Sequence, residues 1–359
     1  MDKREKRLNV GIPLLAIAMS LVVGAVVMLC LGKNPLQAYW SLLQGCGLAP
    51  KASYAGHKGM ITDFTSFLNY LTPMIFAALA VAVALRAGLF NIGVSGQMLA
   101  AGFLASITVG YSSLHWAIAK PLVILIGIAA GALLGALVGW LKYQFNINEV
   151  VSTIMLNYII QYVVSFFINM KFVDPVSRQS KVISDNSRLI LADRVIGDYK
   201  IDLPIGFFLA LIVVFLVKFL FDKTVAGFEM RAVGSNRKAA EYAGIKVGKN
   251  LVLSMTISGA LAGLAGVTYY LGYFASIQPR TLSSTGFDAI AVSLLGANNP
   301  VGIIFSSVLI SVISKGSTYM SSASGIVAEI TGVISGIILL FSACSGYMKE
   351  KIIHRKEGK

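Results

Sequence analysis

Residues 121–141, PLVILIGIAAGALLGALVGWL, form an apolar run without a single charged side chain. As a helix rising about 1.5 Å per residue, this run spans about 30 Å, the thickness of the hydrocarbon core of a membrane. The whole chain shares this character: 56% of its 359 residues are hydrophobic, 13% are charged, and the mean hydropathy is +0.77. Soluble domains carry about 25% charged residues. The composition therefore excludes a soluble globular protein and predicts an all-α polytopic membrane protein.

Ten apolar segments are candidate membrane spans. Nine are close to the length that a bilayer requires, and they cover 11–31, 66–86, 91–110, 120–141, 150–170, 204–221, 251–274, 301–319 and 326–348. The tenth, 285–298, would reach only about 21 Å as a helix. It is a half-helix, a re-entrant segment or a short span inside the bundle. We favour about ten crossings, because nine would place the basic N- and C-termini on opposite sides of the membrane.

The distribution of Lys and Arg predicts the orientation of the chain. Basic residues gather in the N-terminal residues 3–7, in the loop 222–250 and in the tail after 348, so both termini and this loop are expected in the cytoplasm. The loops 32–65 and 171–203 are poor in net positive charge and are expected outside. The segment 11–31 is expected to be an additional, uncleaved N-terminal span. This bias also explains the net charge of +14 without a nucleic-acid partner.

Metal and enzyme sites are not predicted. The three cysteines and the three histidines lie far apart in the sequence, so neither a zinc motif nor a disulfide framework is present. No nucleophile lies beside a base in any recognisable pattern. Carboxylates and histidines are scarce inside the candidate spans, which argues against a proton-driven carrier and for an external energy source.

Two stretches interrupt the helical pattern, and each offers candidate functional residues. The first runs from Leu85 to Gln97 and the second from Ser284 to Ser293. Both contain Gly and Phe, then Asn or Asp, then small residues and a Ser, which suggests a two-fold repeat. Each is either a simple kink or a discontinuous helix of the kind that carries transporter sites.

A line of polar residues follows the span 150–170 at four-residue spacing. It consists of Glu149, Thr153, Asn157, Gln161, Ser165 and Asn169. Such a line stays on one connected stripe of a helix, and polar groups facing lipid would be costly. The stripe therefore either bonds neighbouring helices or forms one wall of a hydrophilic translocation path.

The loop after the sixth span contains the stretch GFEMRAVGSNRKAAEYAGI, residues 227–245. Asn236 can cap a short helix that runs through Ala243, and Gly244 can end it. The small residues Ala239 and Ala240 would let this helix lie in a groove of another protein. A solvated connector is the alternative.

Three stretches resemble a known family. RAVGSNRKAAEYAGI, residues 231–245, resembles the coupling loop of bacterial ATP-binding-cassette importer permeases for ribose, other simple sugars and branched-chain amino acids. LRAGLFNIGVSGQMLAAGF, residues 85–103, and NEVVSTIMLNYI, residues 148–159, are similar to the nucleoside branch, in particular to its longer permease subunit. The resemblance covers roughly residues 60–345.

The resemblance implies a single transmembrane permease domain over 1–359, which translocates nucleosides across the bacterial plasma membrane. ATP with magnesium would bind a separate cytoplasmic ATPase with two cassettes, and this chain would bind no cofactor. Further implied partners are a second, different permease and an extracellular substrate-binding lipoprotein. The resemblance places ATPase coupling in the loop 222–250, at Gly234, Asn236, Arg237, Ala239, Ala240 and Gly244.

The translocation path is an inference from the polar stripe and the helix breaks. Its candidate residues are Phe90, Asn91, Ser95, Gln97, Glu149, Thr153, Asn157, Gln161, Phe287, Asp288 and Ser293. Aromatic stacking and amide hydrogen bonds would suit a nucleobase and a ribose. The alternatives are the same machinery carrying ribose, another simple sugar or a branched-chain amino acid, and a stand-alone secondary carrier.

Overall fold

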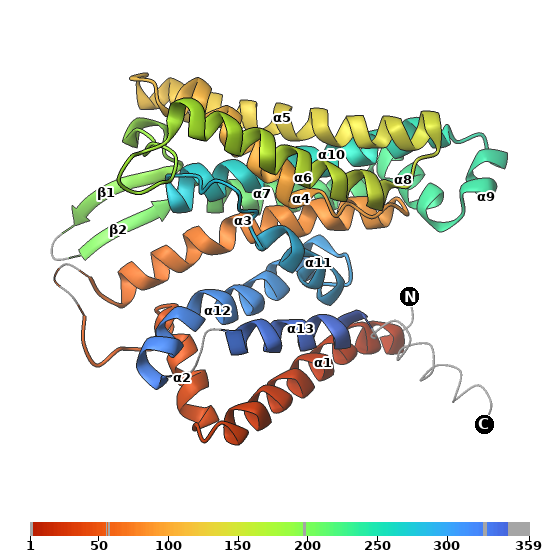
Figure 1. The fold of residues 1–359 in the computed structure, drawn as a ribbon. Helices are drawn as coiled ribbons and strands as arrows, with labels where there is room; N and C mark the ends of the chain where they lie inside the picture. The colour runs from red at the N-terminus through yellow and green to blue at the C-terminus, as the bar shows by residue number, and fades with distance from the viewer. Residues whose placement is uncertain (1–2, 55, 57, 197–198, 326–328, 344–359) are drawn as a thin grey trace, which may run out of the picture.

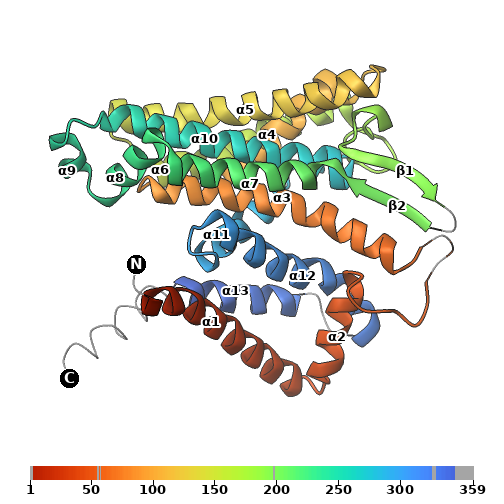
Figure 2. The same cartoon turned by 180° about the vertical axis from the view of Figure 1, so that it is seen from behind.

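The computed structural model describes residues 3–54, 56, 58–196, 199–325 and 329–343, and it consists mainly of helices in two groups (Figures 1 and 2). The first group contains α3 (Met60–Arg86), α4 (Val94–Ala105), α5 (Trp116–Phe145), α6 (Glu149–Phe167), α7 (Ile205–Lys223) and α10 (Val247–Val267). The second contains α1 (Lys3–Cys30), α2 (Pro35–Gly45), α12 (Pro300–Ser324) and α13 (Glu329–Ala343). The short helix α11 (Thr285–Leu295) packs on α3 and on α12, and so joins the two groups.

Glycines allow the closest helix contact of the first group, between α5 and α10. A Cβ atom on Gly131 would overlap the carbonyl oxygen of Gly259, and a Cβ on Gly259 would overlap that of Gly131. Close backbone approach is how helices gain packing energy in lipid, where no hydrophobic force drives them together.

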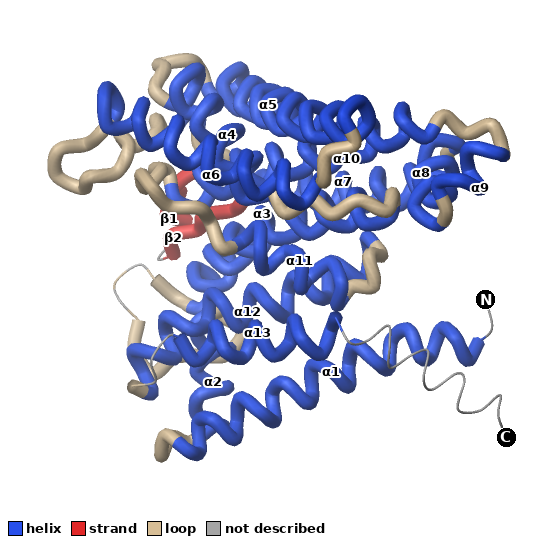
Figure 3. Tube along the Cα trace, turned by 45° about the vertical axis from the view of Figure 1, so that its right-hand side comes forward, coloured by secondary structure: helices blue, strands red, loops and turns tan. Residues whose placement is uncertain are grey.

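The two ends of the molecule carry different structures (Figure 3). At one end, α8 (Val225–Ser235) and α9 (Arg237–Tyr242) project beyond the helices, at the same end as the start of α1 (Figure 1). At the opposite end lies an antiparallel hairpin of β1 (Ile190–Ile196) and β2 (Tyr199–Pro204). The fold is all-helical as expected, and this hairpin in the loop 171–203 is an additional element that the sequence analysis did not predict.

Each of the ten predicted segments coincides with a helix, but fewer helices qualify as spans. Among the described residues, six helices are long and apolar enough to cross a membrane, or seven if the bent pair Ile17–Cys30 and Pro35–Gly45 counts as one span. The helices Val94–Gly110 and Thr285–Leu295 are apolar but shorter. The segment expected over 91–110 becomes helical only at Val94, and parts of 326–348 lie outside the described residues.

The connection 32–65 contains a helix that the sequence analysis did not predict. α2 begins after Asn34, whose side-chain oxygen accepts a hydrogen bond from the backbone N–H of Leu36 at 3.0 Å, and Pro35 occupies its first position. Both are ordinary helix-start signals. α2 is held by packing on α12, a contact that its own apolar pattern does not reveal.

Four short helical turns complete the described elements. Three are π-helical continuations of longer helices: η1 (Ser106–Gly110) follows α4, η2 (Ile168–Phe172) follows α6, and η4 (Thr268–Phe274) follows α10. The fourth is the 3₁₀ turn η3 (Asp185–Ser187).

The two broken segments are arranged reciprocally. α3 runs toward the end that carries α9, and after residues 87–93 the half-helix α4 packs on α10. α10 runs in the opposite direction, and after residues 275–284 the half-helix α11 packs on α3. Each long helix thus supports the half-helix that follows the other, which brings the starts of the two half-helices together.

Candidate functional site

The first break is a buried and hydrogen-bonded connection. Asn91 has no exposed surface. Its side-chain N–H groups donate to Ser258 Oγ on α10 at 2.9 Å and to Gln97 Oε1 on α4 at 3.0 Å. Its own Oδ1 accepts from the backbone N–H of Gly93 at 3.0 Å. The Asn91 amide therefore ties the non-helical segment 87–93 to α4 and α10, and also makes one hydrogen bond within that segment.

Asn157, from the polar stripe on α6, supports the same break. Its Oδ1 accepts a hydrogen bond from the backbone N–H of Gly96 at 2.8 Å, and its Nδ2 donates to the carbonyl of Ile92 at 3.0 Å. The first of these bonds satisfies an N–H in the opening turn of α4, which has no partner within the helix. Inter-helix hydrogen bonding is thus the observed role of Asn157.

The three other path candidates on this stripe lie in different settings. Glu149 pairs with Lys142 at 3.0 Å across the turn between α5 and α6. Thr153 is buried and donates to the carbonyl of Glu149 in its own helix. Gln161 Nε2 donates to the carbonyl of Arg280, in the second break, at 2.6 Å. The stripe therefore connects both breaks to one helix.

The half-helices α4 and α11 meet at their starts. Ser95 Oγ donates to the carbonyl of Ser283 at 2.9 Å, and a Cβ atom on Gly286 would overlap Ser95 Oγ. Ser95 and Gln97 have no exposed surface, and within the described part of the chain the Nε2 atom of Gln97 has no hydrogen-bond partner. Phe90, by contrast, is only partly buried.

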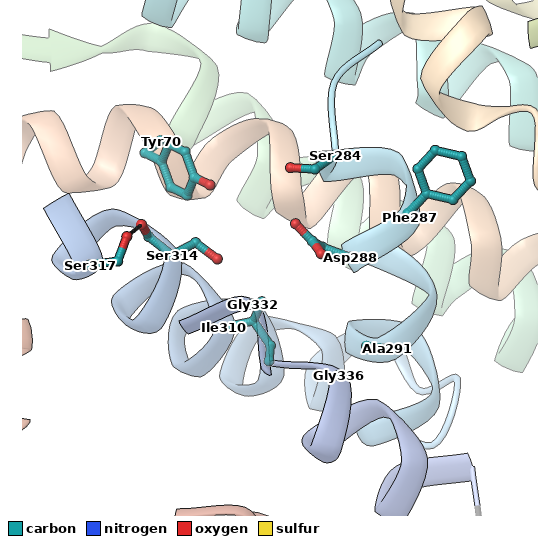
Figure 4. Close-up of a pocket in the computed structure, with 10 residues that line it drawn as sticks. All are labelled: Tyr70, Ser284, Phe287, Asp288, Ala291, Ile310, Ser314, Ser317, Gly332 and Gly336. Atoms are coloured by element: carbon teal, nitrogen blue, oxygen red, sulfur yellow. Dashed lines mark hydrogen bonds between the residues drawn. The ribbon is translucent and has the colours of Figure 1, made fainter. Parts of the chain in front are cut away.

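A cavity of about 450 Å³ opens beside α11, between α3, α12 and α13. This volume lies within the usual range of small-molecule sites, about 300–1,000 Å³. Its lining is mixed: Tyr70, Ser284, Phe287, Asp288, Ala291, Ile310, Ser314, Ser317, Gly332 and Gly336 (Figure 4). Two of the predicted path residues, Phe287 and Asp288, thus line a space that a small molecule can fill.

The polar groups of this cavity converge. In Figure 4 the hydroxyls of Tyr70 and Ser284 point toward the same space as the Asp288 carboxylate, whereas the Phe287 ring points away from them. Ser314 faces this space from α12. Ser293, which was also predicted for the path, is buried on α11 and donates to Asn298 Oδ1 at 2.9 Å, so it closes the end of that helix.

Sequence reasoning missed the residues that complete the cavity. Tyr70 lies within a long apolar span, and the serines of α12 were not read as a stripe. Ser307, Ser311 and Ser314 recur at helical spacing of four and three residues, the same kind of signal as on α6. That signal could have identified the polar face of α12.

The segment α8–α9 has the predicted local structure. Asn236 Oδ1 accepts from the backbone N–H of Ala239 at 3.1 Å, and Gly244 follows α9 with φ +82°. Ala239 is exposed, but Ala240 is buried among apolar residues of its own chain, so its side chain is not available to another protein. Tyr242, which was not predicted, is 94% exposed.

This segment also touches the first break directly. A Cβ atom on Gly234 would overlap the carbonyl oxygen of Arg86. Arg237 donates to the carbonyl of Gly88 at 3.1 Å, and Arg86 Nε donates to the carbonyl of Asn298, at the end of α11, at 2.9 Å. The segment α8–α9 therefore contacts the connection between α3 and α4, and Arg86 at the end of α3 contacts the end of α11.

Residues 64–343 match the family described as branched-chain amino acid transport system / permease component. The chain belongs to this family. The permease is 37% identical to the nucleoside ABC transporter permease protein NupB of Lactococcus lactis, over 94% of this chain and 92% of that one. It is 37% identical to the guanosine ABC transporter permease protein NupP of Bacillus subtilis, over 93% of each chain. The glucose ABC transporter permease protein TsgB13 of Haloferax volcanii is 30% identical over 94% of this chain and 88% of its own.

A solved structure of a metal-chelate type ABC transporter in an inward-facing conformation aligns with the permease at a TM-score of 0.45 and 14% identity. The alignment covers 95% of the permease and 98% of the chain of that transporter. The family assignment rests on the sequence matches. It makes the permease a multi-pass membrane protein and a non-catalytic transport subunit. Among the described residues, no group of three His, Cys, Asp or Glu side chains could hold a metal ion.

Proposed function

We propose that the permease is the transmembrane subunit of an ATP-driven importer that moves nucleosides across the bacterial plasma membrane. The observation that carries this proposal is the 37% identity with NupB and NupP along almost the full length of all three chains. The cavity beside α11 supports it, because hydroxyl groups and one carboxylate suit a neutral polar solute. A sugar is the second candidate, favoured by the similarity to TsgB13.

The proposed topology has ten crossings with both termini in the cytoplasm and an inverted two-fold repeat. The reciprocal packing of α4 on α10 and of α11 on α3 supports the repeat. The common position of α9 and the start of α1 supports the orientation (Figure 1). In a variant without native cysteines, Asn236→Cys should react with membrane-impermeant reagents only from inside. Val176→Cys, which is 91% exposed in the other loop, should react only from outside.

The proposed partners are a cytoplasmic ATPase with two cassettes, a second and different permease, and an extracellular substrate-binding lipoprotein. The exposed face of α9, with Ala239 and Tyr242, is the proposed ATPase contact. Ala239→Trp should abolish co-purification of the ATPase in mild detergent. Ala117→Trp changes an exposed alanine near the opposite end and should not. Equal co-purification of the ATPase with both variants would contradict the proposed contact.

Uptake of labelled guanosine by a deletion strain tests the cargo. We expect guanosine uptake to be lost and then restored by the plasmid-borne permease, with ribose, glucose and leucine uptake unchanged. Unchanged guanosine uptake, together with loss of ribose or glucose uptake, would replace the nucleoside with a sugar as cargo.

A further inference from the structure

We propose that the cavity beside α11 binds the vicinal diol of a ribosyl group, with Asp288 as the acceptor of both hydroxyls. This inference rests on the proposed function for its choice of cargo, and it names the part of the cargo that the permease itself reads. The same diol chemistry occurs in a free pentose, so nucleoside and free sugar have to be distinguished by experiment.

The charge inside the cavity favours this ligand. Asp288 is the carboxylate of the described lining, and this lining contains no Lys or Arg. Both ion pairs of the described residues, Lys51–Asp63 and Lys142–Glu149, lie elsewhere. A carboxylate without a cationic partner gains most from hydrogen-bond donors, and its two oxygens match the two adjacent O–H groups of a cis-diol.

The hydroxyl groups around Asp288 complete a polar wall. Ser284 lies within hydrogen-bonding reach of the Asp288 carboxylate, and the Tyr70 hydroxyl points into the same space (Figure 4). Hydroxyls rotate and can donate or accept, so they can bond the remaining oxygens of a sugar ring. An amino-acid cargo fits less well, because its carboxylate would meet Asp288 and hydroxyls and no cation from the described lining.

The opposite wall leaves room for the ligand. Gly332 and Gly336 lie one helical turn apart on α13, and a Cβ atom at either would meet no described atom within 4 Å. Gly131 and Gly259 are different, since a Cβ there would overlap backbone. Glycine costs a helix about 1 kcal/mol relative to alanine. The absence of side chains at Gly332 and Gly336 therefore leaves this side of the cavity open to a ligand.

The test measures uptake of guanosine and 2′-deoxyguanosine by the complete transporter in proteoliposomes, with wild-type permease and with Asp288→Ala. We expect the uptake ratio of guanosine to 2′-deoxyguanosine to fall by about tenfold in Asp288→Ala, the effect of losing roughly one charge-assisted hydrogen bond. The wild-type and Asp288→Ala transporters use the same binding protein. The preference of that protein for one nucleoside therefore cancels when the two uptake ratios are compared. Equal losses for the two cargoes, or no loss, would overturn the proposal.

A second measurement requires no variant and holds even if Asp288→Ala fails to assemble. The wild-type transporter should discriminate between guanosine and 2′-deoxyguanosine more strongly in uptake than the isolated binding protein does in equilibrium binding. Equal discrimination would show that the permease does not read the diol. If no nucleoside is taken up but ribose is preferred over 2-deoxyribose in an Asp288-dependent way, the diol site stands and the nucleoside function fails.

Discussion

The two breaks of the permease each lead into a half-helix, but they are held from opposite ends of the molecule. The first, at 87–93, contacts the segment α8–α9 through Gly234 and Arg237. The second, at 275–284, contacts the loop 171–203: Ser180 N–H donates to the carbonyl of Ile277 at 2.9 Å, and Ile183 N–H donates to that of Ala275 at 3.1 Å. In the proposed orientation one break is therefore coupled to the ATPase side and the other to the side of the binding protein.

Burial separates the two breaks as well. Asn91, Ser95 and Gln97 of the first break and its half-helix have no exposed surface, whereas Phe287 and Asp288 at the second half-helix border a cavity. A buried network is suited to transmitting a displacement, and a cavity is suited to binding a solute. We therefore propose that the first break serves coupling to the ATPase and that the second serves binding of the cargo.

The largest expected effect comes from breaking the contact between α8 and the first break. In Gly234→Ala the new Cβ would overlap the carbonyl oxygen of Arg86, and backbone atoms cannot move aside as a side chain can. Overpacking of this kind costs about 1–3 kcal/mol. We expect guanosine uptake to be nearly abolished and the thermal unfolding temperature of the purified permease to fall.

Gly11→Ala is the matched control for this variant. Gly11 lies on α1, and a Cβ there would meet no atom of the described residues within 4 Å. Its uptake and unfolding temperature should equal those of the wild type. Wild-type values for Gly234→Ala would show that the contact is looser than its geometry indicates and that coupling takes another route.

Two variants of α6, each lacking one side-chain amide, test the difference in burial between the two breaks. Asn157→Ala leaves the N–H of Gly96 and the carbonyl of Ile92 unpaired inside the bundle, at a cost of roughly 2–4 kcal/mol. Gln161→Ala frees only the carbonyl of Arg280 at a partly exposed site, where the cost stays below about 1 kcal/mol. The free energy of unfolding, measured by titration with SDS, should rank the variants in this order. If Gln161→Ala lost more stability than Asn157→Ala, the first break would not be a buried, hydrogen-bonded connection.

The smallest effect concerns the loop that holds the second break. Hydrogen bonds from the Ser177 hydroxyl at 2.7 Å, and from the backbone N–H groups of Ser177 and Val176, lower the pKa of Asp174. A carboxyl with a lowered folded-state pKa stabilises the turn above its ordinary pKa of about 4, and this contribution is lost as the pH falls through the lowered value.

The protection of the Val176 and Ser177 amides against hydrogen exchange should therefore decrease as the pH falls below about 4. Protection here means the intrinsic exchange rate at each pH divided by the measured rate. The variant Asp174→Ala, which lacks the carboxylate, should exchange fast at every pH. A wild-type turn whose protection does not depend on pH in this range would contradict the assigned role of Asp174.

Local features were predictable from the sequence because they depend on neighbouring residues. Asn236 as a helix cap, Gly244 as a helix end and the apolar runs of the spans all follow from local rules, and each is found in the structure. The outcome for Ala239 and Ala240 shows the limit. Both are small and adjacent, yet Ala239 is exposed and Ala240 is buried in an apolar cluster that includes Leu89 and Val233. Which side of a helix is buried depends on what packs against it.

Hydropathy and backbone preferences act over a few residues, so the sequence was sufficient to predict a bundle of apolar helices with two interruptions. It also identified Phe287 and Asp288 as candidates at the second interruption. In contrast, the folded chain was needed to show that Asn157 bonds the first break, and that Tyr70 and Ser314 face Asp288 across a cavity. The reason is physical: these groups lie between about 26 and 218 residues apart in the chain, and only helix packing brings them together.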